Sequence, residues 1–266
     1  MTLNSHNRAQ SASLHFLLAL FCAIFTAQMV IADAPPATQP AAASPGEAPT
    51  GVDPQLWTQM VAIDARASHI TSMVAHFQQE KFTALMRKPI VSSGTIRIKG
   101  SMMRWDTTEP YPSTMLFSDR EAKIFYPNPA PGTLEVYSLD QRMAEMAASP
   151  LPRLKILKET FSFAQIPVHD MDANAKDDGF LALRMTPREQ SLKEHVQEVR
   201  VLLDAQAGYI VRAEMTDADG DRTVLHFSQI KLNVDPGKLE LTVPAGTKVV
   251  HPLEGLEGAA PHAPSK

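Results

Sequence analysis

Cysteine is almost absent from this chain. The one cysteine, Cys22, lies within an apolar run near the N-terminus, "HFLLALFCAIFTAQMVIA". The run ends in small or aliphatic residues up to Ala32, which predicts a secretory signal peptide over residues 1–32 that is cleaved after about Ala32. An uncleaved anchor helix is the alternative. Cleavage would remove the cysteine, which excludes disulfides and thiolate metal sites from the mature chain.

A strong net charge is also lacking. Lysine and arginine number 25 against 29 aspartates and glutamates, so the formal charge is −4. This balance argues against nucleic acid or another polyanion as the main ligand. The sequence has no H-E-x-x-H pair, no G-x-S-x-G motif and no glycine-rich phosphate loop. The acidic run "DADGD" at 217–221 lacks the later acidic ligand of a calcium loop, and a hairpin turn explains it better. We therefore expect no metal, no cofactor and no enzymatic activity.

Two stretches contain few large apolar residues. Residues 33–52 are rich in alanine and proline, and residues 251–266 have a similar composition. Such segments bury too little surface to order themselves, so they are interpreted as a linker and a disordered tail. The folded domain is expected over residues 53–250, a length that supports one good core.

The domain is predicted to open with a helix. Asp53 and Pro54 are typical of an N-cap followed by the first helical position. Apolar residues then recur at helical spacing, at Leu56, Met60, Ile63, Ala67 and Ile70. We expect this helix to end near Ser68 and a strand to run from about Thr71 to Leu85.

Short strands separated by turn signals make up most of the remaining chain. Alternation puts Met103 and Trp105 on one face and Arg104 on the other. Hairpin turns are expected at Gly179, Gly208 and Gly220, and a late strand at "LELTVP", residues 239–244. Residues 140–168 have a helical composition interrupted by prolines and predict one or two short helices. Many short strands of regular spacing favour an antiparallel barrel or sandwich, whose inner face the helices would fill.

An ordered series of weak motifs resembles the LolA-type outer-membrane lipoprotein carrier family. The first part includes an F-x-Q strand, a strand-opening glycine, an Arg-Trp strand followed by proline, an aspartate hairpin and a Tyr-Pro strand end. These features correspond to Phe77, Gln79, Gly94, Arg104, Trp105, Pro110, Asp119, Tyr126 and Pro127. The C-terminal signature corresponds to Leu239, Leu241, Pro244, Gly246 and Val249.

The resemblance implies a mainly β fold, a half-open antiparallel β-barrel of the LolA/LolB type closed by an N-terminal helix and short central lid helices. It implies a monomeric periplasmic carrier that takes acylated lipoproteins from an inner-membrane ABC exporter to an outer-membrane acceptor. In this family a basic residue before the tryptophan strand is thought to tie the barrel to the lid. Lys99 and Arg104 are the candidates for this latch.

Methionine is the residue type that best suits the lining of such a carrier, because its flexible side chain repacks around ligands of variable shape. The candidate lining residues are apolar residues expected on the inner strand faces or on the central helices. They are Met73, Phe77, Ile96, Ile98, Met103, Trp105, Met115, Met143, Met146, Met185 and Met215. An ordinary core role is the alternative for each of them.

Two other functions remain open at this stage. The same fold is compatible with an envelope sensor or a glycolipid-binding protein, because fold alone does not fix the ligand. A periplasmic hydrolase would need a nucleophile near His195, which has Glu194 and Glu198 close to it in sequence.

Overall fold

The computed structural model describes residues 48–118, 120–139, 153–175 and 178–252. One sheet of twelve strands dominates it. Its first strands are β1 (Ser72–Phe82), β2 (Ile90–Lys99), β3 (Met102–Glu109), β4 (Ser113–Ser118), β5 (Glu121–Tyr126) and β6 (Thr133–Ser138). The later strands are β7 (Phe161–Ile166), β8 (Phe180–Pro187), β9 (Val196–Asp204), β10 (Tyr209–Asp217), β11 (Arg222–Leu232) and β12 (Lys248–Val250). The helices are α2 (Pro54–Ala67), α4 (Leu154–Thr160), α5 (Gln190–Lys193) and the 3-10 helix η1 (Val168–Asp170).

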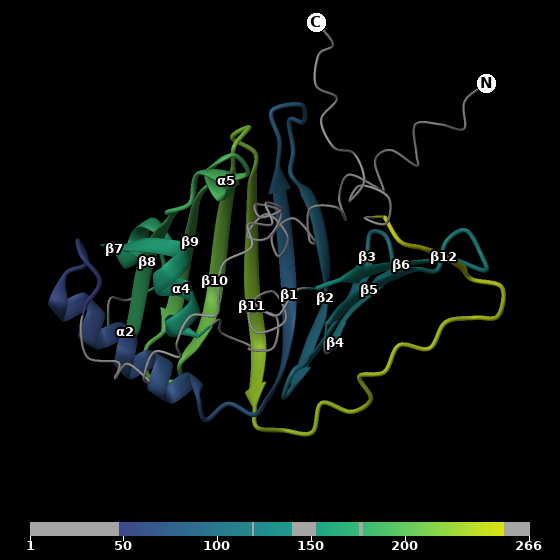
Figure 1. The fold of residues 1–266 in the computed structure, drawn as a ribbon, viewed down its shortest axis with the longest axis horizontal. Coiled ribbons are helices and arrows are strands. Elements are labelled where there is room, and N and C mark those ends of the chain that lie inside the picture. The colour runs from purple at the N-terminus through teal and green to yellow at the C-terminus, as the bar shows by residue number, and fades with distance from the viewer. Residues whose placement is uncertain (1–47, 119, 140–152, 176–177, 253–266) are drawn as a thin grey trace, which may run out of the picture.

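The strand order is β12-β6-β5-β4-β3-β2-β1-β11-β10-β9-β8-β7. Neighbouring strands are antiparallel except β12, which lies parallel to β6. The sheet therefore consists of two meanders, β1–β6 and β7–β11, joined by the pairing of β1 with β11. Figure 1 shows the two halves on either side of this central pair, with β7 and β12 as the outer strands. The predicted half-open, mainly β fold is confirmed, and the sheet is not a closed barrel.

The start of α2 follows the capping rule expected from the sequence. The Asp53 carboxylate accepts hydrogen bonds from the backbone N–H groups of Gln55 and Leu56, each at 2.9 Å. These bonds satisfy donors that have no partner within the helix. The helix ends at Ala67, one residue before the expected end, and β1 ends three residues earlier than expected, at Phe82.

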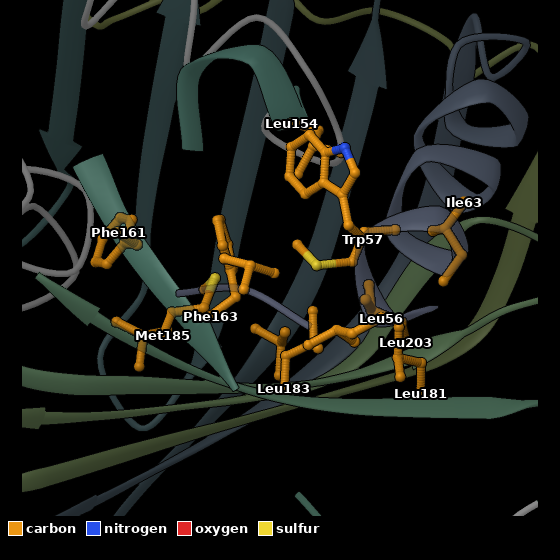
Figure 2. Packing of buried hydrophobic residues seen from close by; sticks show 14 of the residues in the cluster. Leu56, Trp57, Ile63, Leu154, Phe161, Phe163, Leu181, Leu183, Met185 and Leu203 are labelled. Atoms are coloured by element: carbon orange, nitrogen blue, oxygen red, sulfur yellow. The ribbon is translucent and has the colours of Figure 1, made fainter. Parts of the chain in front are cut away.

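The apolar stripe of α2 packs against the β7–β10 half of the sheet. Leu56, Trp57 and Ile63 of α2 lie close to Leu183 and Phe163 of the strands, with Leu154 of α4 beside them (Figure 2). We call this set of contacts the helix-covered cluster. It forms because Leu181, Leu183 and Met185 alternate on one face of β8, as Val199, Val201 and Leu203 do on β9.

The opposite face of β8 and β9 carries a small cluster of its own. Ala182 and Leu202 pack there against Val168 of η1 and the following Met171. The described residues therefore cover the opposite face of this half of the sheet only around Ala182 and Leu202, whereas Arg184 further along β8 is exposed.

Two expected elements differ in the structure. Within 140–168, only Leu154–Thr160 is a described helix, and Phe161–Ile166 is strand β7, because Phe161 and Phe163 are buried while Ser162 is exposed. Residues 140–152 lie outside the described residues. The strand expected over 239–244 is absent, because this segment has no strand partner and instead lies against the arginines described below.

The N-terminal residues 1–47, with the expected signal peptide and most of the linker, lie outside the described residues, as do residues 253–266 of the tail. Among the helices that the structure does describe, none has the length and apolarity needed to span a bilayer.

Candidate functional site

A second apolar cluster occupies the inner face of the other half of the sheet. Alternating residues of β1–β6 point to this face, joined by one residue of β11 and one that follows β6. We call this set the β1–β6 apolar face. Its buried members are Met73, Ala75, Phe77, Ile96, Ile98, Met103, Trp105, Met115, Phe117, Ala122, Ile124, Tyr137, Leu139 and Leu225.

The structure divides the candidate lining residues between the two clusters. Seven of them lie together on the β1–β6 apolar face, namely Met73, Phe77, Ile96, Ile98, Met103, Trp105 and Met115. Met185 and Met215 belong to the helix-covered cluster and pack in the same core as α2. Met143 and Met146 lie outside the described residues.

The described helices do not contribute to the β1–β6 apolar face. The buried residues of α2, and Leu154 of α4, are members of the helix-covered cluster. The described part of the β1–β6 apolar face therefore consists of strand residues and Leu139.

Trp105 lies at the centre of this face. Its ring centroid is 4.4 Å from that of Phe77, and it meets the ring of Phe227 edge-on at 6.2 Å. Such tilted and edge-to-face arrangements are the favoured geometries of aromatic pairs. The three rings thus join β3, β1 and β11 across β2.

Gly94 allows these rings to meet across the backbone of β2. It lies on β2 opposite Phe77, at a register shift between β2 and β3. A Cβ atom at this position would lie 1.9 Å from the carbonyl oxygen of Asp106 and 2.9 Å from the ring of Phe77. Only glycine fits, because strand β3 and the ring of Phe77 approach the β2 backbone too closely for any side chain.

Among the residues that the structure describes, three buried polar atoms on the inner face have no hydrogen-bond partner. They are Nε1 of Trp105, Oε1 of Gln79 and Oγ1 of Thr223. The residues are only 3%, 5% and 2% exposed, respectively. An enclosed polar atom without a partner costs free energy, so each of the three needs an explanation.

The latch candidate Arg104 lies on the outer face, opposite to its neighbour Trp105. Its guanidinium donates to the Asp106 carboxylate at 2.9 Å and to the backbone carbonyl oxygen of Glu240 at 2.6 Å. Arg97 also pairs with Asp106 and donates to the carbonyl oxygen of Lys238. The two arginines therefore hold the extended C-terminal segment against β2 and β3.

The charge at this outer site is well compensated. Burial raises the pKa of Asp106, but hydrogen bonds from Arg104, Arg97 and Thr114 outweigh that effect and hold the pKa below its ordinary value. Lys99 is exposed at the end of β2. Within the described residues, no hydrogen bond or ion pair joins Lys99 or Arg104 to α2 or α4. The proposed latch stays a prediction.

The described link between the helices comes from a different pair. Arg153, directly before α4, donates to both carboxylate oxygens of Asp64 on α2 at 3.0 and 2.8 Å. The same carboxylate accepts the backbone N–H of Leu154, so it also caps the start of α4. Sequence analysis missed this contact, because no local pattern connects residues 89 positions apart.

The residues considered for an acid–base cluster, Glu194, His195 and Glu198, lie in the turn after α5 and at the start of β9. His195 is exposed in the turn after α5, and Glu198 pairs with Arg200 at 2.6 Å. In the part of the chain that the structure describes, no three histidine, cysteine, aspartate or glutamate side chains are grouped so that they could hold a metal ion.

Comparison with known proteins gives one family. Residues 68–239, well over half of the chain, match the family described as outer membrane lipoprotein carrier protein LolA. No curated protein matches the sequence.

Several solved structures resemble the fold. The lipoprotein LppX of Mycobacterium tuberculosis is 12% identical, over 71% of this chain and 100% of that chain, with a TM-score of 0.43. MucB in the Pseudomonas aeruginosa MucA/MucB complex is 15% identical over 73% and 62% of the two chains, with a TM-score of 0.42. The LolA superfamily protein NE2245 of Nitrosomonas europaea is 17% identical over 70% and 96%, with a TM-score of 0.36.

Proposed function

Because the chain belongs to the outer membrane lipoprotein carrier (LolA) family, we propose that it is a non-enzymatic carrier of acylated lipoproteins. In this proposal the acyl chains lie on the β1–β6 apolar face, and the protein ferries them across the periplasm from the inner to the outer membrane. The observation that carries the proposal is that seven of the residues chosen as lining from sequence form one apolar face.

The energetics of acyl binding set a limit on this face. Each buried methylene is worth about 0.8 kcal/mol, so a chain of roughly fifteen methylenes contributes on the order of 12 kcal/mol. Two or three fully buried chains would exceed the practical ceiling of about 18–21 kcal/mol. Release therefore requires partial burial, which is what an unclosed sheet provides. Methionine and isoleucine on the same face supply contacts of adaptable shape.

The proposed partners follow from the family. An inner-membrane ABC exporter would deliver the lipoprotein, and an outer-membrane acceptor would receive it. The carrier would act as a monomer in the periplasm after removal of residues 1–32. The latch role of Lys99 and Arg104 and the lining roles of Met143 and Met146 are part of the same proposal. For Met185 and Met215 the proposal takes the alternative, an ordinary core role, because both pack in the same cluster as α2.

The two tryptophans of the chain provide a direct test. Trp105 is on the β1–β6 apolar face, and Trp57 is in the helix-covered cluster. Two variants, Trp57→Phe and Trp105→Phe, each retain one tryptophan as a fluorescent reporter. A lipopeptide with bromine-labelled acyl chains should quench Trp105 in the first variant and leave Trp57 in the second variant unquenched.

The outcome decides between sites. Quenching of Trp57 alone would indicate that the acyl chains bind at the helix-covered cluster instead. Absence of any soluble complex between the wild-type protein and a triacylated lipoprotein, in detergent-free buffer, would refute the carrier function. Mass spectrometry of lipids that co-purify from the periplasm distinguishes lipoprotein cargo from a free lipid or glycolipid.

A further inference from the structure

The three unpartnered polar atoms form a row along the paired strands β1 and β11. Trp105 contacts the Phe77–Phe227 pair, Gln79 lies at the next inward position of β1, and Thr223 lies one inward position further along β11. Successive inward positions on a strand are about 7 Å apart. The row is therefore a polar path beside apolar residues, and we call it the polar row.

The polar row ends the apolar surface of β1. Met73, Ala75 and Phe77 are the earlier inward residues of this strand and belong to the β1–β6 apolar face. Lys81, opposite Thr223, is the next inward residue after Gln79. Burial lowers the pKa of Lys81, while the carboxylates of Asp221 and Asp217 act in the opposite direction. Polarity thus increases along β1 toward the β1–β2 hairpin.

We infer that the polar row is a subsite for the ester or amide group at which acyl chains join the rest of the cargo. The indole N–H of Trp105 and the hydroxyl of Thr223 supply donors for carbonyl oxygens at two separate positions along the row. The Gln79 oxygen supplies an acceptor for an amide N–H. The acyl chains would then extend toward Met73 and the polar part of the cargo toward Lys81. This inference rests on the proposed acyl-binding function.

The inference explains why an otherwise apolar face keeps costly polar atoms. A buried group left unpaired in the free protein gains its partner only when cargo binds, so it favours cargo with carbonyl groups over a plain hydrocarbon. A water molecule is the competing occupant, and it would give no preference among lipids.

The test compares a diacyl phosphatidylglycerol with its dialkyl ether analogue of equal chain length, which lacks both carbonyl groups. The wild-type protein should bind the ester lipid about tenfold more tightly, the equivalent of one buried hydrogen bond at about 1.4 kcal/mol per tenfold. Thr223→Val, which keeps the shape of the side chain, should lower this ratio severalfold, because the indole N–H of Trp105 is then the remaining donor of the row. Thr160→Val is the matched control, because Thr160 is equally buried but its hydroxyl is hydrogen-bonded to the carbonyl of Ile156 on α4.

The outcomes separate the subsite from the carrier function. Equal binding of ester and ether lipids by the wild-type protein would overturn the subsite and leave acyl binding intact. Binding of neither lipid, nor of a lipopeptide, would overturn both. A synthetic lipopeptide, prepared with and without its N-acyl amide, tests whether the row also binds an amide group. Gln79→Leu should reduce only the preference for the amide.

An independent observation concerns the β1–β2 hairpin, residues 83–89, which protrudes beyond the rest of the sheet (Figure 1). At its tip Leu85 is 97% exposed and Met86 is 53% exposed. Arg87 and Lys88 follow directly and are also exposed. The tip is held in place, because the backbone N–H of Ala84 donates to the Asp221 carboxylate at 3.2 Å.

Exposed hydrophobic residues concentrate at this end of the sheet. Val91 at the base of the same hairpin and Tyr111 in the β3–β4 turn are 47% and 51% exposed. Apolar tip residues next to cations are typical of segments that insert between lipid headgroups of an anionic surface. The chain as a whole is acidic, so this pair of cations is a local feature rather than a consequence of net charge.

We propose that the β1–β2 hairpin tip docks the protein on an anionic lipid surface. Wild-type protein should bind vesicles containing phosphatidylglycerol about tenfold better than pure phosphatidylcholine vesicles, and Arg87→Gln/Lys88→Gln should remove that difference. Leu85→Ser/Met86→Ser should reduce binding to both vesicles. The control is Val234→Ser/Val249→Ser, which alters exposed apolar residues outside the tip. Vesicle binding that is unaffected by the Leu85/Met86 variant, or absent from the wild-type protein, would overturn the proposal and favour a protein partner for the tip.

Discussion

Thr223→Val should stabilise the ligand-free protein. The Thr223 side chain is 2% exposed, and its hydroxyl is enclosed without a hydrogen-bond partner. Burying an unpaired hydroxyl costs about 1–3 kcal/mol, and valine replaces that hydroxyl with a methyl group of similar size. The free energy of unfolding of the variant should therefore exceed that of the wild-type protein by about this amount.

The matched variant, Thr160→Val, should have the opposite effect. Thr160 is 3% exposed, but its hydroxyl donates to the carbonyl oxygen of Ile156 at 3.3 Å. Loss of one hydrogen bond of this kind costs about 0.5–1.5 kcal/mol. The two substitutions make the same chemical change at similar burial, so the opposite signs of their effects report on whether each hydroxyl has a partner.

Thermal unfolding of the two purified variants measures both effects. For a domain of this size each kcal/mol shifts Tm by roughly 2–4 °C, upward for Thr223→Val and downward for Thr160→Val. If Thr223→Val lowers Tm as much as Thr160→Val does, the Thr223 hydroxyl has a partner in the folded protein and the polar row loses one member. If the row binds cargo, an ester lipid should raise the Tm of the variant less than that of the wild-type protein.

Three further substitutions test the packing around the site. Gly94→Ala would place a Cβ atom 1.9 Å from the Asp106 carbonyl oxygen, so it should cost about 3 kcal/mol or more and lower the urea midpoint. Asp64→Asn removes the ion pair with Arg153, and because that pair is partly exposed it should cost only about 1 kcal/mol while speeding hydrogen exchange in α4. Asp106→Asn should cost about 1–2 kcal/mol at neutral pH and expose the C-terminal segment to proteases. Because the pKa of Asp106 is depressed in the folded protein, its stabilisation is lost as pH falls below about 4 through that depressed pKa, and the variant should lack this part of the acid sensitivity.

The parts of the site that the sequence predicted correctly follow from local periodicity. Inward and outward positions alternate along a strand, so Met103 and Trp105 could be assigned to one face and Arg104 to the other without knowledge of the neighbouring strands. The N-cap at Asp53 was predictable for the same reason, because it involves only the next three residues.

Contacts between distant segments could not be obtained in this way. Both methionine-bearing halves of the sheet have inward apolar residues, and nothing local indicates that α2 covers the half with Met185 rather than the half with Met103. The polar row depends on the register between β1 and β11, which the sequence does not reveal.

The segment over 239–244 shows how a local pattern can mislead. Its alternation of leucine and valine with polar residues is typical of a strand. In the structure the backbone carbonyl groups nearby accept hydrogen bonds from Arg97 and Arg104 instead of a strand partner. Side chains that donate to backbone oxygens can replace a ladder, and the resulting segment has strand composition without strand pairing.

The polar row and the β1–β2 hairpin tip lie toward the same end of the sheet, because β1 passes Gln79 and Lys81 before it reaches the hairpin with Leu85. The row should then set the affinity for cargo, and the tip should set the rate of transfer to a membrane. In a Trp57→Phe background, transfer of a bromine-labelled lipopeptide to vesicles restores the fluorescence of Trp105. The added Leu85→Ser/Met86→Ser change should slow this recovery severalfold and leave the ester preference unchanged, since both residues lie beyond the end of β1. Recovery at an unchanged rate would mean that cargo leaves through water rather than by docking at the tip.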